Sequence, residues 1–372
     1  MKVSFVNLKP LSNRGGAEKW ISEVGHIIED MGNEVEILVP SCENNIAEIA
    51  GFKHIFYKSR IFILMKRLKL LNFYPPLLNI PLDNNLGVVY VTTIHSLLLF
   101  KKVIKLNTKL IVGTHDLFIP NHSVGVDLFQ KISLSGINKL SKRHAITVHS
   151  LNLLTTNMFR KSKTDVIEIG NEFIVLLSEK KLEKNQEKLD SDRSNKFRVF
   201  FLGNLEPRKG SKLIPKLFRS FSANDKIEFV IAGKIKDKKL LKKLSTFHNN
   251  FIFKGEIDDL EKEFLFSNSD LFMFLSEREA SPIVIEEAFS NGLPVVSTWV
   301  SIVKLNSFKI SECTVCNRKI REVKNSIIKY YEYWSRDTQK YYSEKKARSV
   351  LYYSTYEMAN YKEQLVDMIL SS

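Results

Sequence analysis

The sequence contains few cysteines, and their number is odd. Cys42, Cys313 and Cys316 are the three cysteines among 372 residues. So small and uneven a set does not suggest a disulfide framework, and a chain of this length can bury enough apolar surface to be stable without one. Sparse cysteine fits a reducing compartment, and we therefore expect a cytoplasmic protein.

Long hydrophobic runs are also missing. The apolar stretch at the N-terminus is too short for the core of a signal peptide. The longest weakly polar run, residues 86–100, is interrupted by Thr92, Thr93, His95 and Ser96. A membrane-spanning helix needs about 20 apolar residues, so we expect neither a leader nor a transmembrane segment.

Acidic residues are outnumbered. The chain has 56 lysines and arginines against 41 aspartates and glutamates, which gives a net charge of +15. This excess predicts affinity for an anionic partner, although solvated lysines on an ordinary surface are the alternative. No RNP-type strand, zinc finger or helix-turn-helix signature accompanies the charge, so we expect no nucleic-acid partner.

Short apolar runs alternate with helical stretches along the chain. Residues 17–31 have helical spacing and lie between strands predicted at 2–8 and 34–40. A polar stretch at 178–196 separates this half from a second one, in which the alternation restarts. The order predicts an α/β chain with two doubly wound parallel sheets. Further strands are predicted at 87–93, 109–115, 145–150, 166–170, 197–203, 227–233, 251–255, 270–275 and 293–298.

Two glutamates flank a predicted helix start in SEREASPIVIEEAFSNGLPVVST. Glu279 precedes the helix and Glu287 lies in its second turn. Ser281 is the predicted N-cap and Pro282 the predicted first helical residue. Free N–H groups at a helix start suit phosphate, and carboxylates suit sugar hydroxyls. Helical spacing leaves open whether Glu286 or Glu287 faces a ligand, and two solvated glutamates are the alternative.

A basic turn follows a predicted strand in FLGNLEPRKG (201–210). Arg208 and Lys209 can reach the edge of the sheet where the carboxyl ends of its strands lie, which is where open α/β sheets bind ligands. Lysine offers a compact charge to a diphosphate, and arginine offers two donors. The spacing of a P-loop is absent, and a basic turn without a ligand is the alternative.

Two loops of the first half also follow strands. Gly15 and Gly16 permit close approach of a ligand at a helix N-terminus, although a tight turn explains them equally well. His115, beside Asp116, could donate to a phosphate or transfer a proton. An isolated His-Asp pair is more often structural than catalytic, and His149, at another strand end, is a weaker candidate.

Two metal-like patterns carry little weight. Asp190 and Asp192 form a DxD within the polar stretch, where acidic pairs arise by chance. Cys313 and Cys316 form a single CxxC, whereas zinc needs about four ligands. We therefore expect no metal site.

Basic and apolar residues interleave in YKSRIFILMKRLKLLNFYPPLLNIPL (57–82). This composition is typical of a helix that lies on an anionic membrane surface, and packing on the first domain is the alternative. A membrane position would suit a lipid-linked acceptor at the cytoplasmic leaflet. The basic residues concerned are Lys58, Arg60, Lys66, Arg67 and Lys69.

In their order, these motifs resemble the retaining glycosyltransferases of the GT-B fold, in the group 1 family often called GT4. The resemblance implies two Rossmann-like domains that face a central cleft. Residues 1–177 would bind the acceptor, 196–352 the nucleotide sugar, and a helix at 353–372 would return to the first domain. The matching motifs are GGAE (15–18), GNEVEIL (32–38), GNLEPRKG (203–210), FKGEI (253–257) and the E-x7-E pair of Glu279 and Glu287 followed by G-x-P-V-V.

The resemblance also implies roles for single residues. Sugar would leave a nucleotide diphosphate with retention and without a metal or other cofactor. The expected catalytic residues are His115 at the transferring centre, Glu279 on the donor sugar and Lys209 on the departing diphosphate. The expected donor-binding residues are Gly15, Gly16, Asn204, Arg208, Lys209, Ser281, Pro282, Ile283, Val284 and Glu287.

The expected function is hexosyl transfer from a UDP- or GDP-sugar to a glycan or lipid-linked acceptor, in synthesis of a cell-surface polysaccharide or glycolipid. The protein would be cytoplasmic and peripheral on the inner face of the membrane. Asn204 stands where the family usually has an arginine, and IGNE (169–172) replaces its I-P-N-G. These departures support an alternative: a catalytically degenerate relative that binds a glycan or a partner protein.

Overall fold

The protein is represented by a computed structural model, which divides into two compact units. Unit 1 comprises Met1–Ile174 and Asn360–Ser372, and unit 2 comprises Val175–Ala359. Within the part of the chain that the structure describes, no helix is both long and apolar enough to cross a bilayer. The described residues are 1–12, 15–68, 87–92, 109–115, 135, 137, 146–151, 153–160, 165–172, 174–175, 195–235, 237–244, 246, 250–277, 279, 281–299, 302–303, 305–357 and 360–371.

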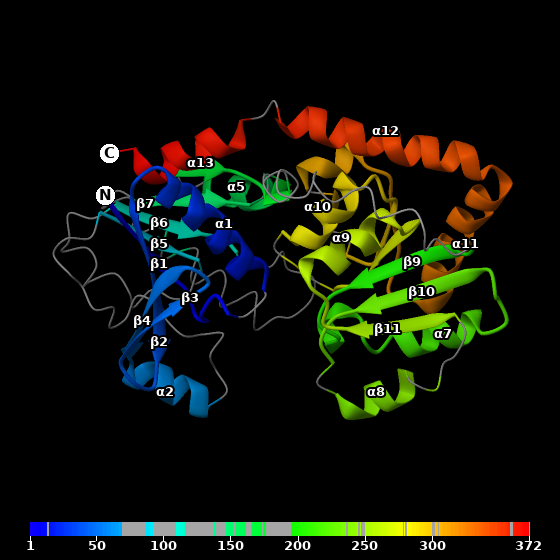
Figure 1. The fold of residues 1–372 in the computed structure, drawn as a ribbon, viewed down its shortest axis with the longest axis horizontal. Helices are drawn as coiled ribbons and strands as arrows, with labels where there is room; N and C mark the ends of the chain where they lie inside the picture. The colour runs from blue at the N-terminus through cyan, green and yellow to red at the C-terminus, as the bar shows by residue number, and fades with distance from the viewer. Residues whose placement is uncertain are drawn as a thin grey trace. The chain divides into compact units, whose positions relative to one another are not determined.

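Unit 1 is built on a sheet to which the described residues contribute eight strands, in the order β3-β4-β2-β1-β5-β6-β7-β8 (Figure 1). Only β3 is antiparallel to its neighbour. The chain moves outward from β1 on one side and then from β5 on the other, so the winding direction reverses between β1 and β5. The strands are β1 (Lys2–Val6), β2 (Glu34–Ser41), β3 (Asn45–Ile49), β4 (Phe52–Lys58), β5 (Val88–Val91), β6 (Lys109–Gly113), β7 (Ile146–Ser150) and β8 (Asp165–Glu168).

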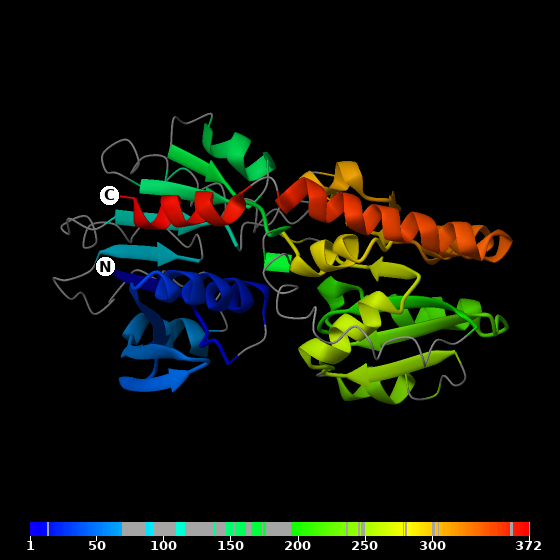
Figure 2. The ribbon, with the colours of Figure 1, turned by 45° about the horizontal axis from the view of Figure 1, so that its top comes forward.

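Helices α1 and α13 cover one face of this sheet (Figure 2). Helix α1 forms where the sequence has helical apolar spacing, and it buries Trp20, Ile21 and Val24. Gly25 lets it approach β4, because a Cβ there would lie 2.7 Å from the ring of Phe52. The described helices of unit 1 include α1 (Gly16–Asp30), α2 (Arg60–Arg67), α5 (Leu153–Arg160) and α13 (Tyr361–Leu370).

Unit 2 repeats the same winding. Its described strands form one parallel sheet in the order β11-β10-β9-β12-β13-β14, so the direction reverses between β9 and β12. The strands are β9 (Phe197–Leu202), β10 (Ile227–Ala232), β11 (Phe251–Gly255), β12 (Leu271–Phe274), β13 (Val295–Ser297) and β14 (Cys313–Val315).

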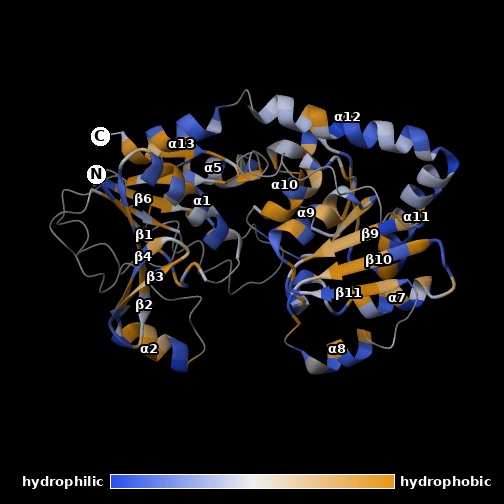
Figure 3. Cartoon of the chain, in the orientation of Figure 1, coloured by the Kyte–Doolittle hydropathy of each residue, from blue (hydrophilic) through white to orange (hydrophobic). Residues whose placement is uncertain are grey.

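The core of unit 2 is rich in phenylalanine. Strands β9 and β10 are apolar along most of their length (Figure 3), as expected for parallel strands covered on both faces. Phe218 of α7 stacks on Phe251 of β11, with ring centroids 4.0 Å apart. The helices are α7 (Ile214–Phe221), α8 (Lys238–Leu244), α9 (Asp259–Ser267), α10 (Ile283–Ser290), α11 (Ile320–Arg336) and α12 (Thr338–Glu357), with 3-10 turns η4 (Pro207–Lys209) and η6 (Asn306–Ile310).

The predicted fold class is confirmed: the chain is α/β, with two doubly wound parallel sheets. Every strand predicted from an apolar run is present, with its ends displaced by no more than two residues. Strands β3, β4 and β14 were not predicted, and β3 is largely exposed at the edge of its sheet, where no continuous apolar run is needed. The predicted central cleft concerns the placement of one unit against the other and stays a prediction.

Candidate functional site

The reversal point of unit 2 brings together the loops that follow β9 and β12. The β9 loop contains the turn η4, which ends at Gly210 with a φ of 93°. A Cβ at Gly210 would lie 2.4 Å from the Cβ of Leu275 and 2.8 Å from its carbonyl oxygen. The backbone N–H of Glu277 donates to the carbonyl oxygen of Arg208 over 2.9 Å. Glycine therefore allows the basic turn to sit directly against the end of β12.

Three predicted site residues converge at this junction. Arg208 Nη1 and Lys209 Nζ each lie 2.7 Å from Glu279 Oε1. The Glu279 side chain is 11% exposed, whereas Arg208 and Lys209 are 31% and 21% exposed. Two cations thus share one carboxylate at the carboxyl ends of β9 and β12, where open α/β sheets bind ligands.

The position of Glu279 is fixed from the opposite side as well. Ser276 donates from Oγ to the same carboxylate oxygen over 2.7 Å. The Ser276 carbonyl oxygen in turn accepts from Thr298 Oγ, 3.2 Å away, and the Thr298 N–H donates to Phe274. The loops after β12 and β13 therefore hold the carboxylate in place before any ligand arrives.

Helix α10 begins one residue later than predicted. Pro282 has the extended backbone of an N-cap (φ −77°, ψ 115°), and Ile283 is the first helical residue. The prediction that Ser281 is the N-cap is therefore wrong. Pro282 occupies the N-cap position, and helical backbone begins only after it. The predicted donor-binding residues Ile283 and Val284 lie in the first turn of α10, with Ile283 buried and Val284 partly exposed.

The two adjacent glutamates of α10 have different partners. Glu286 is 1% exposed and accepts from Ser307 Oγ and Tyr352 Oη at 2.8 and 3.0 Å. Glu287 instead lies 3.1 Å from Lys262 Nζ of α9. Glu286 thus ties α10 to α12, and Glu287 is the member of the pair that remains a candidate for a ligand.

Lys262 is a residue that the sequence did not single out. Its Nζ lies between Glu287 and Asp259, 3.1 and 2.7 Å away. Burial by itself lowers the pKa of Lys262, but the Glu287 and Asp259 carboxylates outweigh burial and raise that pKa above its ordinary value. The helical spacing of Asp259 and Lys262 could have suggested this pair, but nothing in the sequence indicated contact with Glu287.

The β9 loop also contains a close backbone contact. Gly233, after β10, has a φ of 134°, and a Cβ there would lie 2.1 Å from the Gly203 carbonyl oxygen. Asn204 follows Gly203 and is exposed. Asn204 has no guanidinium group. The arginine that lies beside Lys209 at the Glu279 carboxylate is Arg208.

The site residues predicted in the first half belong to unit 1. Gly15 is the N-cap of α1 and Gly16 its first residue. A Cβ at Gly15 would lie 2.0 Å from a Glu18 carboxylate oxygen, so the glycine makes room for that side chain. His115 lies two residues after the end of β6, and its Nε2 lies 3.1 Å from Tyr90 Oη. Asp116 lies outside the described residues, as does the Asp190–Asp192 pair.

The basic segment of unit 1 is divided between two elements. Lys58 ends β4, whereas Arg60, Lys66 and Arg67 belong to α2. Ser59 caps α2 by accepting from the Phe62 N–H, 3.2 Å away. Lys69 lies outside the described residues.

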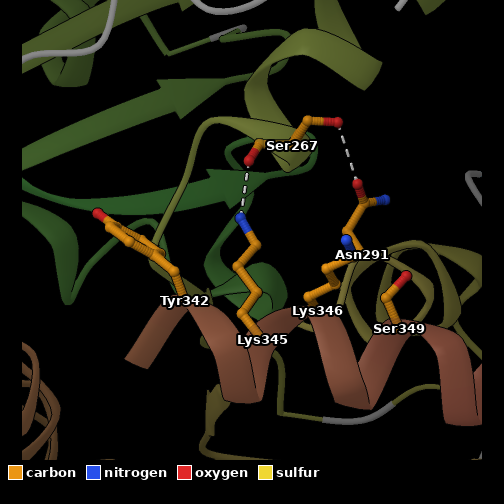
Figure 4. Close-up of a pocket in the computed structure, with 6 residues that line it drawn as sticks. All are labelled: Ser267, Asn291, Tyr342, Lys345, Lys346 and Ser349. Carbon is orange, nitrogen blue, oxygen red and sulfur yellow. Dashed lines mark hydrogen bonds between the residues drawn. The ribbon is translucent and has the colours of Figure 1, made fainter. Parts of the chain in front are cut away.

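A shallow pocket of about 320 Å³ lies beside α12, away from these residues (Figure 4). Lys345 donates to the carbonyl oxygens of Ser267 and Ser269, each over 2.7 Å. This lysine therefore satisfies carbonyls at the end of α9. None of the predicted site residues lines the pocket; its lining is Ser267, Asn291, Tyr342, Lys345, Lys346 and Ser349.

The CxxC cysteines are both thiols. Cys313 and Cys316 lie at β14 and are partly buried. Burial raises the pKa of Cys313 to about 12 and that of Cys316 to about 11. Thiols with pKa values this high are poor nucleophiles at neutral pH.

The geometry of unit 2 agrees with sequence comparison. Residues 182–305 match the family described as glycosyl transferases group 1. This part of the chain is similar to the group 1 glycosyl transferases. The match includes Arg208, Lys209, Glu279 and Glu287, and it confirms the resemblance at the level of group 1. Comparison with curated proteins finds no match.

Solved structures show the same fold. Anabaena HepE, determined with UDP and glucose, has a TM-score of 0.65 at 17% identity over 99% of each chain. WaaG, a glycosyltransferase involved in lipopolysaccharide biosynthesis, has a TM-score of 0.63 at 13% identity over 100% of each chain. The pneumococcal O-GlcNAc transferase GtfA, determined with UDP and GlcNAc, has a TM-score of 0.64 at 9% identity over 100% of this chain and 99% of GtfA. All three support the GT-B fold class.

Proposed function

We propose that this protein is a retaining glycosyltransferase of the GT4 type, which moves a hexose from a UDP- or GDP-sugar to a glycan or lipid-linked acceptor. The observation that carries the proposal is the cluster of Arg208, Lys209 and Glu279 at the reversal point of the unit 2 sheet. The structures of HepE and GtfA contain UDP, which supports a nucleotide sugar as the donor of this protein.

The chemistry of the cluster suits a departing diphosphate. Lys209 and Arg208 are partly exposed, and together they outnumber the single carboxylate that they share. A diphosphate placed here would meet cations already held in position, so charge that develops as the glycosidic bond breaks is stabilised without reorganisation of the site. The N–H groups at the start of α10 add the positive end of a helix dipole.

Glu287 and Glu279 would recognise hydroxyl groups. Each carboxylate has two oxygens that can each accept more than one hydrogen bond, so a cation on one oxygen still allows a bond from a sugar hydroxyl. In this proposal Glu287 holds the ribose and Glu279 the donor sugar. No step requires a metal, because the cations of the chain neutralise the diphosphate.

Helix α2 supports a membrane position for the acceptor. None of its residues is fully buried; Leu64 is 54% exposed, and Leu68, directly after the helix, is 55% exposed. Lys66 and Arg67 end the same helix, which combines hydrophobic and hydrophilic residues (Figure 3). A basic helix with exposed leucines suits the surface of an anionic membrane, and we propose peripheral attachment at the cytoplasmic leaflet for polysaccharide or glycolipid synthesis.

The test is transfer from UDP- and GDP-sugars to acceptors in a membrane extract, together with thermal unfolding in UDP and in GDP. An active enzyme is expected to release one nucleotide and to be stabilised by it, by about 2.7 kcal/mol at a hundredfold excess over Kd. Stabilisation without transfer from any common donor would favour the degenerate relative. Neither stabilisation nor transfer would reject the proposal.

A further inference from the structure

Unit 1 contains a chain of hydrogen bonds behind His115 that the proposed donor site does not use. Tyr90 Oη lies 3.1 Å from His115 Nε2 and 2.5 Å from His149 Nδ1. His149 Nε2 lies 3.0 Å from the Ile169 carbonyl oxygen. These groups come from the ends of β5, β6, β7 and β8, and Tyr90 and His149 are completely buried.

The protons of this chain can be assigned one by one. A carbonyl oxygen only accepts, so His149 Nε2 must carry a proton and donate it to Ile169. Burial lowers the pKa of His149 to about 4, which keeps the ring neutral at pH 7 and leaves Nδ1 as an acceptor. The hydroxyl proton of Tyr90 is therefore donated to His149 Nδ1.

The position of the ring proton of His115 follows from that of the Tyr90 hydroxyl proton. Tyr90 has one proton and has donated it, so its oxygen can only accept from His115 Nε2. Burial, and to a lesser degree His149, lower the pKa of His115 well below its ordinary value, so this ring is neutral as well. With the single ring proton on Nε2, Nδ1 of His115 is unprotonated. Among the described residues, none forms a hydrogen bond with that nitrogen.

The surrounding side chains keep the rings in place. The Trp20 ring centroid lies 4.7 Å from that of His115 and 5.0 Å from that of Tyr90. Gly113 leaves space for the pair, because a Cβ there would lie 2.5 Å from Tyr90 Oη and 2.8 Å from His115 Cδ2. Any larger residue at position 113 would displace the hydroxyl that links the two histidines.

We propose that Tyr90 and His149 are positioning residues that hold His115 in its Nε2–H tautomer and so present Nδ1 to the substrate as a hydrogen-bond acceptor. The nature of the substrate rests on the proposed function. A bare nitrogen accepts from a sugar hydroxyl, whereas it cannot donate to a phosphate oxygen. The chain thus restricts His115 to contact with a hydroxyl group and excludes the phosphate contact that the sequence left open.

The tautomer can be read directly by nitrogen NMR of the full chain labelled at its histidine rings. Pyrrole-type Nε2 and pyridine-type Nδ1 signals are expected for both His115 and His149 at neutral pH. A protonated Nδ1 at either ring, or a charged His115, would overturn the proposal. This measurement uses no substrate, so its result does not depend on whether the proposed function is correct.

A variant tests the positioning role. Tyr90→Phe removes the acceptor of the Nε2 proton, so the His115 nitrogen signals are expected to move toward the average of the two tautomers. Tyr330→Phe, which removes another buried hydroxyl bonded to Thr314 in unit 2, is the matched control and is expected to leave them unchanged. Signals of His115 that stay fixed in Tyr90→Phe would overturn the role of Tyr90.

Transfer kinetics add a readout that a purely structural role would not produce. In Tyr90→Phe, kcat is expected to fall roughly tenfold, which is a modest loss for one misplaced hydrogen bond. Stabilisation by UDP is expected to stay as in the unchanged protein, since the proposed contacts of Arg208, Lys209 and Glu287 with the nucleotide do not involve Tyr90. A variant with wild-type kcat and shifted nitrogen signals would overturn the link between the tautomer and the reaction.

Discussion

Arg208 Nη1 lies 2.7 Å from Glu279 Oε1, although 71 positions separate the two residues in the chain. Lys209 lies at the same distance from the same oxygen. The unliganded site therefore already balances part of its positive charge. In the proposed function, a diphosphate would compete with Glu279 for both cations, so this carboxylate would limit affinity as well as bind the donor sugar.

Replacement of Glu279 by glutamine should separate binding from transfer. Loss of the carboxylate frees both cations, so UDP is expected to bind about fivefold more tightly, which corresponds to about 1 kcal/mol. Transfer should fall, because the donor sugar loses a hydrogen-bond partner. Calorimetric titration with UDP measures the first effect. Glu256→Gln, at an exposed pair with Lys234, is the control and should alter neither quantity.

Lys209→Ala removes a cation from the departing diphosphate. Transfer is expected to fall by about a hundredfold, in line with the loss of one preorganised electrostatic contact at a reacting centre. Initial rates at saturating donor measure the change. Lys254→Ala, which breaks a partly exposed pair with Glu261, provides the comparison. Equal rates in the two variants would reject the role of Lys209.

The turn that carries these cations should be sensitive to a single methyl group. Gly210→Ala combines a left-handed backbone with a collision against Leu275 and is expected to lower the free energy of unfolding by about 3 kcal/mol or more. Gly255→Ala has a similar backbone (φ 74°) but nothing within 4 Å, so only about 1 kcal/mol is expected. Urea unfolding of both variants measures the difference, and similar losses would show that the close contact is unimportant.

The sequence predicted the sheets and much of the site for a definite physical reason. Buried parallel strands need continuous apolar runs, so FRVFFL at β9 and IEFVIA at β10 were recognisable without tertiary information. Loops that follow such strands lie at one edge, which is why Lys209 and Glu279 could be assigned to a common region.

What the sequence did not reveal depends on contacts between distant segments. Tyr90 lies inside an apolar strand, β5. Its role depends on His115, which follows the adjacent strand β6, and on His149 of β7, the next strand beyond. The choice between Glu286 and Glu287 likewise required the positions of Tyr352 and Lys262, which come from helices α12 and α9. Helical spacing alone could not distinguish two adjacent residues.

Glu172 predicts an unusual pH dependence. Burial, assisted by Glu168, raises its pKa to about 7, and its Oε2 has no partner among the described residues. A carboxyl whose folded pKa is raised contributes its stability below about pH 4.5 and loses it as the pH rises through about 7. The free energy of unfolding of Glu172→Gln, relative to that of the unchanged protein, should therefore increase as the pH rises, by about 3 kcal/mol in total.

The measurement is urea unfolding of both proteins from about pH 4 to about pH 8. His149, whose pKa is lowered to about 4, acts in the opposite direction but is present in both proteins and cancels in the difference. Glu43→Gln, at an exposed glutamate of unit 1, is the control and is not expected to show this gain. Parallel curves for Glu172→Gln would contradict the assignment.

The neighbouring glutamates of α10 should have separable effects. Glu286→Gln weakens two buried hydrogen bonds to a carboxylate and is expected to lower the free energy of unfolding by about 2 kcal/mol, with little effect on nucleotide affinity. Glu287→Gln should weaken binding of UDP by about tenfold through loss of a charged acceptor for the ribose hydroxyls. Urea unfolding and calorimetric titration of the same two proteins measure both quantities. If Glu286→Gln lost nucleotide affinity and Glu287→Gln kept it, the ribose contact would have to be assigned to Glu286.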